Sequence, residues 1–185
     1  MVELAVSMTV LLILTAIAIP SLVRSFRTYQ LNDAAARLSD MLKFTRFEAV
    51  RRNTQVSFLL QQPSPPDWII GVDSNGNATI DAGETQQVIT GFATLLPSGA
   101  PPSPTAITGA LGGAALTTLS GSPNAVKFDA RGAIRTGGSV SSSVYVFYIG
   151  SATNPEFGYR AVILLPSGNT QVWTAPTAGP WQQVS

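Results

Sequence analysis

The chain has 185 residues, of which only 11% are charged, and its 11 basic and 10 acidic residues nearly cancel. That balance excludes the strong field by which a protein attracts nucleic acid or an acidic substrate. The sequence contains no cysteine and no histidine, which excludes disulfides, thiolate zinc sites, cysteine nucleophiles and the commonest general base. The length suits one domain with a sizeable core plus an appendage.

The first element is an uncharged segment, residues 4–23, which is about as long as a helix that crosses a hydrocarbon core of roughly 30 Å. A cleavable secretory signal would carry positive charge before the apolar run, whereas the early charge here is the negative Glu3. An ordinary single-span anchor is a second interpretation, in which Arg24 and Arg27 mark the cytoplasmic side. That interpretation gives Glu3 no role.

Glu3 at the edge of this apolar segment predicts a positively charged partner, because an ionisable group there is costly unless it is paired. Pro20 follows Glu3 by seventeen residues. This pattern resembles the N-terminal segment of the type IV pilin superfamily, which includes the pseudopilins of type II secretion. The family's glutamate is the fifth mature residue, so we expect this sequence to begin two residues inside the mature protein. The resemblance implies that Glu3 pairs with the N-terminal amine of a neighbouring subunit and that the helix loosens near Pro20.

Residues 21–53 form an amphipathic pattern, with small and apolar side chains at three- and four-residue steps. The stripe consists of Leu31, Ala34, Ala35, Leu38, Met41, Leu42, Thr45 and Ala49. Because no proline or glycine lies between Ser21 and Arg52, we predict one helix from Val2 to Arg52 that packs on a head domain through this stripe. Three aromatic residues lie off the stripe and are expected to contact other subunits: Phe26, Phe44 and Phe47.

The remainder of the chain is typical of antiparallel β structure. Short runs rich in β-branched and aromatic residues are separated by Gly, Pro, Asn and Ser turns. These runs are residues 55–60, 68–72, 86–90, 125–128, 144–149, 159–165 and 171–174. Residues 97–124 are nearly charge-free and rich in small side chains, which predicts either a long surface excursion or a flexible segment.

Four head segments refine the resemblance. They are "ARLSDMLKFTRFEAVRRNTQVSF", "WIIGVDSNGNATIDAGETQQVI", "VKFDARGAI" and "LLPSGNTQVW". They are similar to the pseudopilin H and FimT-like branch, which has a helix ending in Arg-Arg-Asn, a Trp strand followed by an Asp/Asn/Gly loop, and a Phe-Asp-x-x-Gly element. Some DNA-binding members place arginines around the final glycine turn, where this chain has uncharged residues 168–171, so a nucleic-acid partner is not expected.

The loop "DSNGNATIDAGE" carries oxygen ligands at calcium-like spacing. The candidate ligands, at loop positions 1, 3, 5, 9 and 12, are Asp73, Asn75, Asn77, Asp81 and Glu84. The alternative is a polar hairpin loop that uses Asn-Gly turn chemistry. Calcium is the one cofactor that the sequence suggests. The sequence shows no phosphate loop, nucleophile elbow or other catalytic constellation, so we do not expect an enzyme.

The sequence therefore predicts an α+β, pilin-like protein in three parts: residues 1–24 as a hydrophobic transmembrane or filament-core helix, 25–53 as its amphipathic continuation, and 54–185 as a β-rich head. The resemblance implies a homo-oligomeric filament subunit held in the bacterial inner membrane before assembly, then in an extracellular pilus or periplasmic pseudopilus. Its partners would be other pilins or pseudopilins and the inner-membrane assembly platform. The alternatives are a minor pseudopilin and a single-pass anchored binding module.

Overall fold

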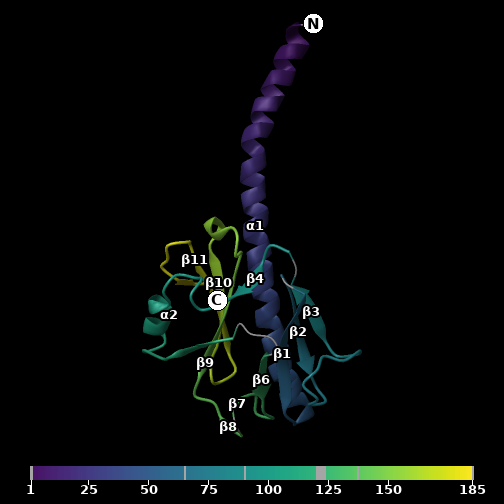
Figure 1. Ribbon diagram of the computed structural model, residues 1–185, viewed down its shortest axis with the longest axis vertical. Coiled ribbons are helices and arrows are strands. Elements are labelled where there is room, and N and C mark those ends of the chain that lie inside the picture. Colours follow the sequence, from purple (N-terminus) through teal and green to yellow (C-terminus); the bar gives the residue numbers. More distant parts are fainter. Residues whose placement is uncertain (1, 65, 90, 120–123, 137, 185) are drawn as a thin grey trace.

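The computed structural model describes residues 2–64, 66–89, 91–119, 124–136 and 138–184. Helix α1 spans Val2–Arg52, which confirms the predicted single helix, and its N-terminal half projects beyond the head (Figure 1). At 1.5 Å per residue the helix is about 75 Å long. It ends where Asn53 adopts a left-handed backbone conformation, at φ 49°. The Asn53 and Thr54 N–H groups donate to the Val50 and Ala49 carbonyls, which closes the last turn.

Two sheets form the head, and all but one of their strand pairs are antiparallel. The first sheet has the order β3-β2-β1-β6-β7-β8. Its strands are β1 Val56–Ser64, β2 Asp67–Asp73, β3 Gln86–Ile89, β6 Asn124–Phe128, β7 Ile134–Thr136 and β8 Ser139–Val140. The second sheet has the order β12-β11-β10-β9-β4, and β5 pairs in parallel with β9. Its strands are β4 Thr94–Leu96, β5 Leu116–Thr118, β9 Val144–Gly150, β10 Tyr159–Leu164, β11 Thr170–Ala175 and β12 Gln182–Gln183.

All seven predicted strand runs are strands in the structure, although Thr90, at the end of one run, lies outside the described residues. The strands that the sequence did not reveal are β4, β5, β7, β8 and β12, each only two or three residues long. Runs this short do not display the alternation that identifies a strand.

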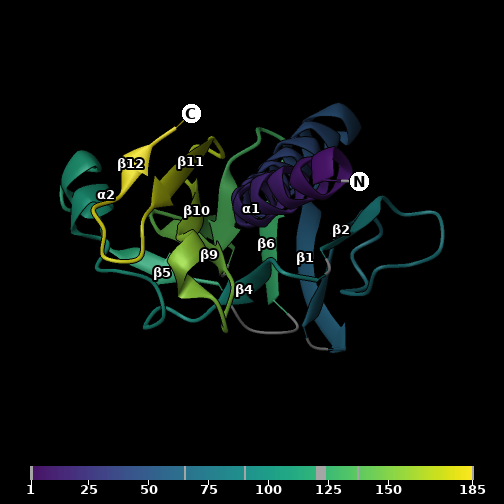
Figure 2. The same ribbon diagram turned by 90° about the horizontal axis from the view of Figure 1, so that it is seen from above.

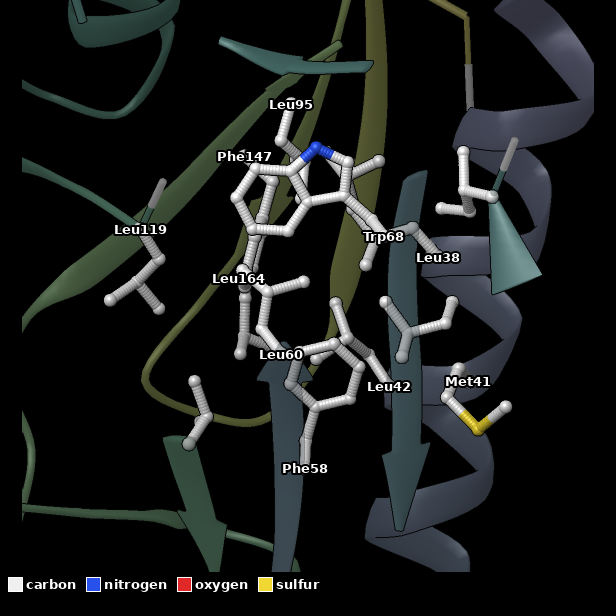
Figure 3. Close-up of a cluster of buried hydrophobic side chains, with 14 of the residues drawn as sticks. Leu38, Met41, Leu42, Phe58, Leu60, Trp68, Leu95, Leu119, Phe147 and Leu164 are labelled. Atoms are coloured by element: carbon white, nitrogen blue, oxygen red, sulfur yellow. The ribbon is translucent and has the colours of Figure 1, made fainter. Parts of the chain in front are cut away.

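The main core lies where α1 packs against both sheets. All eight residues of the predicted helical stripe are buried, which confirms it, and Leu31, Leu38 and Leu42 are 0% exposed. Figure 3 shows Leu38 and Leu42 among side chains from both sheets. Phe58 of β1 and Phe147 of β9 meet edge to face, with ring centroids 5.9 Å apart, and so join the two sheets beneath the helix.

A second layer covers the outer face of the second sheet. Helix α2 (Thr105–Ala110) places Ile107, which is fully buried, in a second cluster. The tail near Trp181 covers the same face (Figure 2). Of the two alternatives for residues 97–124, the surface excursion therefore holds for the described residues 97–119, with a helix and a strand within it. Residues 120–123 lie outside the described part of the chain.

Candidate assembly surface on the N-terminal helix

The free half of α1 exposes a continuous apolar surface. Residues 2–26 are all exposed, and an 18-residue window there has a mean hydropathy of 2.4 with none of it buried. Leu4 is 72% exposed and Ile17 is 70% exposed. Water solvates such a surface poorly, so it requires lipid or other protein around it. The helix is long and apolar enough to cross a membrane.

The hydroxyl groups of Ser7, Thr9 and Thr15 are satisfied by the helix itself. Ser7 donates to the Glu3 carbonyl at 2.9 Å, and Thr9 donates to the Ala5 carbonyl at 2.8 Å. Thr15 lies within 3.0 Å of two carbonyl oxygens in the preceding turn. These local bonds let hydroxyl groups sit in apolar surroundings without an external partner.

Glu3 differs from these residues. Among the polar side chains of residues 2–20, its carboxylate is the one without a hydrogen bond or ion pair to any residue that the structure describes. It lies in the first turn of α1, where the positive end of the helix dipole favours a negative charge. That interaction does not replace a hydrogen-bonding partner once water is excluded.

Pro20 lies within α1, and the helix continues through it. Its ring nitrogen carries no hydrogen, so the backbone loses one hydrogen bond there. Figure 1 shows the free half bending away from the axis of the lower half. Glu3 and Pro20 lie at opposite ends of the free half, about 25 Å apart along the axis. The structure therefore does not bring these two predicted assembly residues together.

An aromatic pair of the head lies beside α1 where the helix leaves the head. The Arg27 guanidinium lies 4.6 Å from the centroid of the Phe92 ring. Phe92 in turn meets Phe157 edge to face at 5.2 Å. Cation–π and edge-to-face contacts each add about a kcal/mol, and here they hold α1 on the head at Arg27.

Polar contacts at seven-residue steps fix the register of α1 on the second sheet. Asn32 accepts a 2.6 Å hydrogen bond from Arg160, and Ser39 lies 2.9 Å from the Thr170 hydroxyl. Arg46 donates to the Asn169 side chain at 2.9 Å. Seven residues make nearly two turns, so the three helical residues share one flank. Burial lowers the pKa of Arg160, which is 7% exposed.

Arg46 also joins two of the head motifs. Its Nε donates to the Gly132 carbonyl at 3.2 Å, in the Phe-Asp-x-x-Gly element, while its Nη1 reaches Asn169, beside the final glycine turn. Gly132 and Gly168 both have positive φ, and a Cβ on either would contact Arg46 closer than 3.0 Å. Both motifs are recognisable in the sequence, but their contact with Arg46 is not, because it spans 86 and 123 residues of chain.

Gly168→Ala is expected to destabilise the head by more than about 2 kcal/mol, because the new Cβ would be strained and would also overlap the Gly132 carbonyl oxygen. Gly113→Ala is the matched control: Gly113 has nearly the same φ, 82° against 81°, but open space around it. Urea denaturation measures both. Equal losses of unfolding free energy for the two variants would show that the close approach of Gly168 to Gly132 and Arg46 contributes nothing.

The predicted calcium loop is held together by its own hydrogen bonds. Asp73 accepts from the Gly76 and Ala78 N–H groups. Asp81 accepts from the Asn75 and Asn77 side-chain amides at 2.8 and 2.6 Å. Glu84 accepts from Ser74 and from the Asp81 N–H.

In these bonds the side-chain N–H groups of Asn75 and Asn77 point towards the Asp81 carboxylate. Within the described residues, the loop carboxylates do not form a group of three that could hold a metal ion. The structure brings three of the five candidate ligands, Asn75, Asn77 and Asp81, into contact through hydrogen bonds, and Glu84 accepts from the Asp81 N–H. Calcium binding stays a prediction, which isothermal titration with calcium chloride tests.

The stability of the head is expected to fall in acid. Hydrogen bonds from Arg51, at 2.7 and 2.9 Å, lower the pKa of Glu48, which is 9% exposed. Burial opposes ionisation of Glu84 and Asp129, but backbone N–H donors outweigh it and lower the pKa of each. Amides of Asn75 and Asn77 lower the pKa of Asp81.

Groups whose pKa is lowered by folding stabilise the folded state above their ordinary pKa, here 4.5 for Glu and 3.8 for Asp, and lose that contribution as the pH falls through the lowered values. With no histidine or cysteine in the chain, we expect unfolding free energy to be flat between about pH 6 and 8 and to drop below about pH 4.5. Urea denaturation across this range checks it, and a transition centred near pH 6.5 would contradict it.

The long helix packed on antiparallel sheets defines an α+β, pilin-like protein. The model of the family "Type II transport protein GspH" matches residues 34–168, which is more than half of the chain. The chain therefore belongs to the GspH family, within the type IV pilin and pseudopilin superfamily, as the head motifs predicted. This is a family of structural subunits of pili or pseudopili, not in general of enzymes.

Two solved structures of the type IV minor pilin FimU from Pseudomonas aeruginosa are similar to this chain. One is 19% identical with a TM-score of 0.49, covering 80% of this chain and 94% of FimU. The other is 16% identical with a TM-score of 0.39, covering 85% of this chain and 90% of FimU. No curated protein matches the sequence.

Proposed function

We propose that the protein is a structural subunit of a type IV pilus-like filament that assembles through the free half of α1. One observation carries the proposal. Residues 2–20 are an exposed apolar segment whose hydroxyl groups are all bonded to their own helix, and in it the Glu3 carboxylate has no partner among the described residues. A carboxylate in that position is suited to a cation supplied by another subunit.

The inner membrane holds the subunit before assembly, with the free half of α1 in lipid. Lipid solvates apolar side chains about as well as neighbouring helices do, so transfer into a filament gains chiefly from packing and from polar pairing. Removing the penalty of an unpaired carboxylate is worth several kcal/mol. In this mechanism Glu3 selects the register in which it meets the N-terminal amine of a neighbour.

Pro20 contributes to assembly by weakening the helix at one point. The missing backbone hydrogen bond lets the free half bend relative to the head, so that neighbouring helices can pack around a common axis. The partners in this proposal are further copies of the chain, other pilins or pseudopilins, and the inner-membrane assembly platform. The filament is an extracellular pilus or a periplasmic pseudopilus.

A second candidate is a minor subunit that initiates or caps a filament of another protein. The match to the GspH family favours this role. Both candidates use the same α1 surface and the same Glu3 pairing. They differ in copy number along the filament.

Electron microscopy of sheared surface material, with mass spectrometry of its protein, tests the proposal. We expect thin filaments in which this chain is the dominant component. Filaments made mainly of another protein, with this chain present in traces, would establish the minor role instead. A chain found only as a monomer in membranes would overturn both, and would leave an anchored binding module.

A further inference from the structure

A groove runs along the flank of α1 that faces the β10–β11 hairpin. One hollow of about 530 Å³ lies between α1, residues 168–171 and Gln183 of β12. A second, of about 240 Å³, is lined by the apolar side chains of Phe47 and Val50. Lys43 and Arg46 line both hollows, so the two adjoin. Their volumes suit a short loop or a few side chains.

Two basic residues, Lys43 and Arg46, line the groove. Arg46 donates to two neutral acceptors, the Gly132 carbonyl and the Asn169 side chain, and forms no ion pair with the residues that the structure describes. The Lys43 side chain is 60% exposed, and its contact with Asp40 is long, at 3.4 Å. Arg131, next to Gly132, is exposed as well. Lys43 is thus paired with Asp40 and Arg131 lies beside Asp129, whereas Arg46 has no carboxylate partner among the described residues.

Negative charge is concentrated elsewhere in the same chain. Residues 53–126 contain no lysine or arginine but four acidic residues, and three of these belong to the acidic loop, residues 73–84, between β2 and β3. Figure 2 shows this loop extending sideways from the head. Residues 75–79 at its tip are exposed and uncharged, Asp73 is buried, and Asp81 and Glu84 are half-buried at its base. No ion pair links the loop to the rest of the described chain.

The groove and the acidic loop lie on opposite flanks of α1. Arg46 faces the groove, whereas Glu48 lines a hollow with Ser74 and Glu84 at the base of the acidic loop. Two helical residues turn through about 200°. Both features lie at the end of the head farthest from the free half of α1, as Figure 1 shows for the β2–β3 and β10–β11 connections. Two copies side by side, with their helices parallel, can therefore present loop to groove.

We propose that the acidic loop of one copy docks in the groove of the next copy. This inference rests on the proposed filament function and names the head surfaces that the filament would use. Different patches on opposite flanks make a head-to-tail contact, which propagates into an open polymer instead of closing as a dimer. Charge complementarity selects the partner and its orientation. A second copy is the occupant because this chain itself supplies the acidic complement at the matching height.

Cysteine cross-linking in full-length protein tests the proposal, and the natural absence of cysteine makes the background clean. Ala78→Cys places a thiol at the loop tip, and Gln183→Cys places one in the groove. Both side chains are exposed and neither makes a side-chain hydrogen bond that the loop or strand needs. The control pair combines Ala78→Cys with Ala152→Cys, which is exposed but lies outside the groove.

Oxidation of assembled material is expected to give a ladder of dimers, trimers and higher multimers with the loop–groove pair, and no ladder with the control pair or either single variant. Filaments that form without such a ladder would overturn this inference and leave the proposed function intact. Cross-links from the loop or groove to a different pilin would overturn the assignment of a second copy as occupant. A chain that stays monomeric, with no filament, would overturn the inference together with the proposed function.

Exchanging charges gives a second, independent measurement. Asp81→Lys and Lys43→Glu are each expected to reduce assembly several-fold, since each places like charges in contact. The double variant is expected to recover most of that loss, because the attraction is restored with its sign reversed. Losses that simply add would contradict a direct contact between the two sites.

Discussion

Glu3→Ala is expected to lower the fraction of the chain in filaments at least about tenfold, since a charge pair in an apolar environment contributes several kcal/mol and 1.4 kcal/mol is a factor of ten. The thermal midpoint of the head should not change, because residues 2–26 make no buried contact with it. Immunoblots of sheared and membrane fractions measure the distribution, and electron microscopy measures filament length.

Two variants separate the charge from the side chain's bulk. Glu3→Gln keeps the shape and removes the charge, so it should assemble nearly as poorly as Glu3→Ala. Ser7→Ala removes a neighbouring polar group whose hydrogen bond is internal to the helix, so it should assemble normally. Normal assembly of Glu3→Gln would mean that the carboxylate does not set the register.

Trp181→Ala is expected to destabilise the head by about 3–5 kcal/mol, the usual cost of removing a large buried aromatic side chain. Trp181 is 3% exposed and packs on Tyr148, with ring centroids 5.7 Å apart. Its Nε1 donates to the Pro102 carbonyl at 3.2 Å. It thereby joins the C-terminal tail, residues 97–119 and the second sheet without a disulfide. Urea denaturation measures the loss.

Graded variants show whether Trp181 has this role. Trp181→Phe keeps an aromatic ring but loses the hydrogen bond to Pro102, so it should cost less, about 1–2 kcal/mol. Val184→Ala, at a side chain that is 66% exposed, should change little. A Trp181→Ala loss below 1 kcal/mol would indicate that the tail is held by its short β12 pairing alone.

The features that could be predicted from the sequence are those indicated by the spacing of residues that are close together in the chain. The stripe from Leu31 to Ala49 repeats at helical spacing, and the seven strand runs are long enough to be recognised, so both emerged from neighbouring residues alone. The Glu3–Pro20 pattern likewise lies within one segment. These signals sufficed for the α+β class and for the superfamily.

What the sequence did not reveal depends on distant contacts. Arg46 meets Gly132 and Asn169 only because the sheets bring their turns to one flank of α1. Local spacing also does not say which way an amide turns: in the acidic loop Asn75 and Asn77 donate to Asp81, and calcium binding there stays a prediction. The groove opposite that loop is lined by residues that are far apart in the sequence, so the sequence alone does not reveal it.

We propose that the free half of α1 is the assembly element. Cryo-electron microscopy of purified filaments tests it most directly. We expect residues 2–26 of neighbouring copies to pack on one another along the filament axis, with the heads outside and each Glu3 carboxylate within hydrogen-bond distance of a neighbour's N-terminal amine. Filaments held together by the heads alone, with this helix outside the subunit contacts, would contradict it.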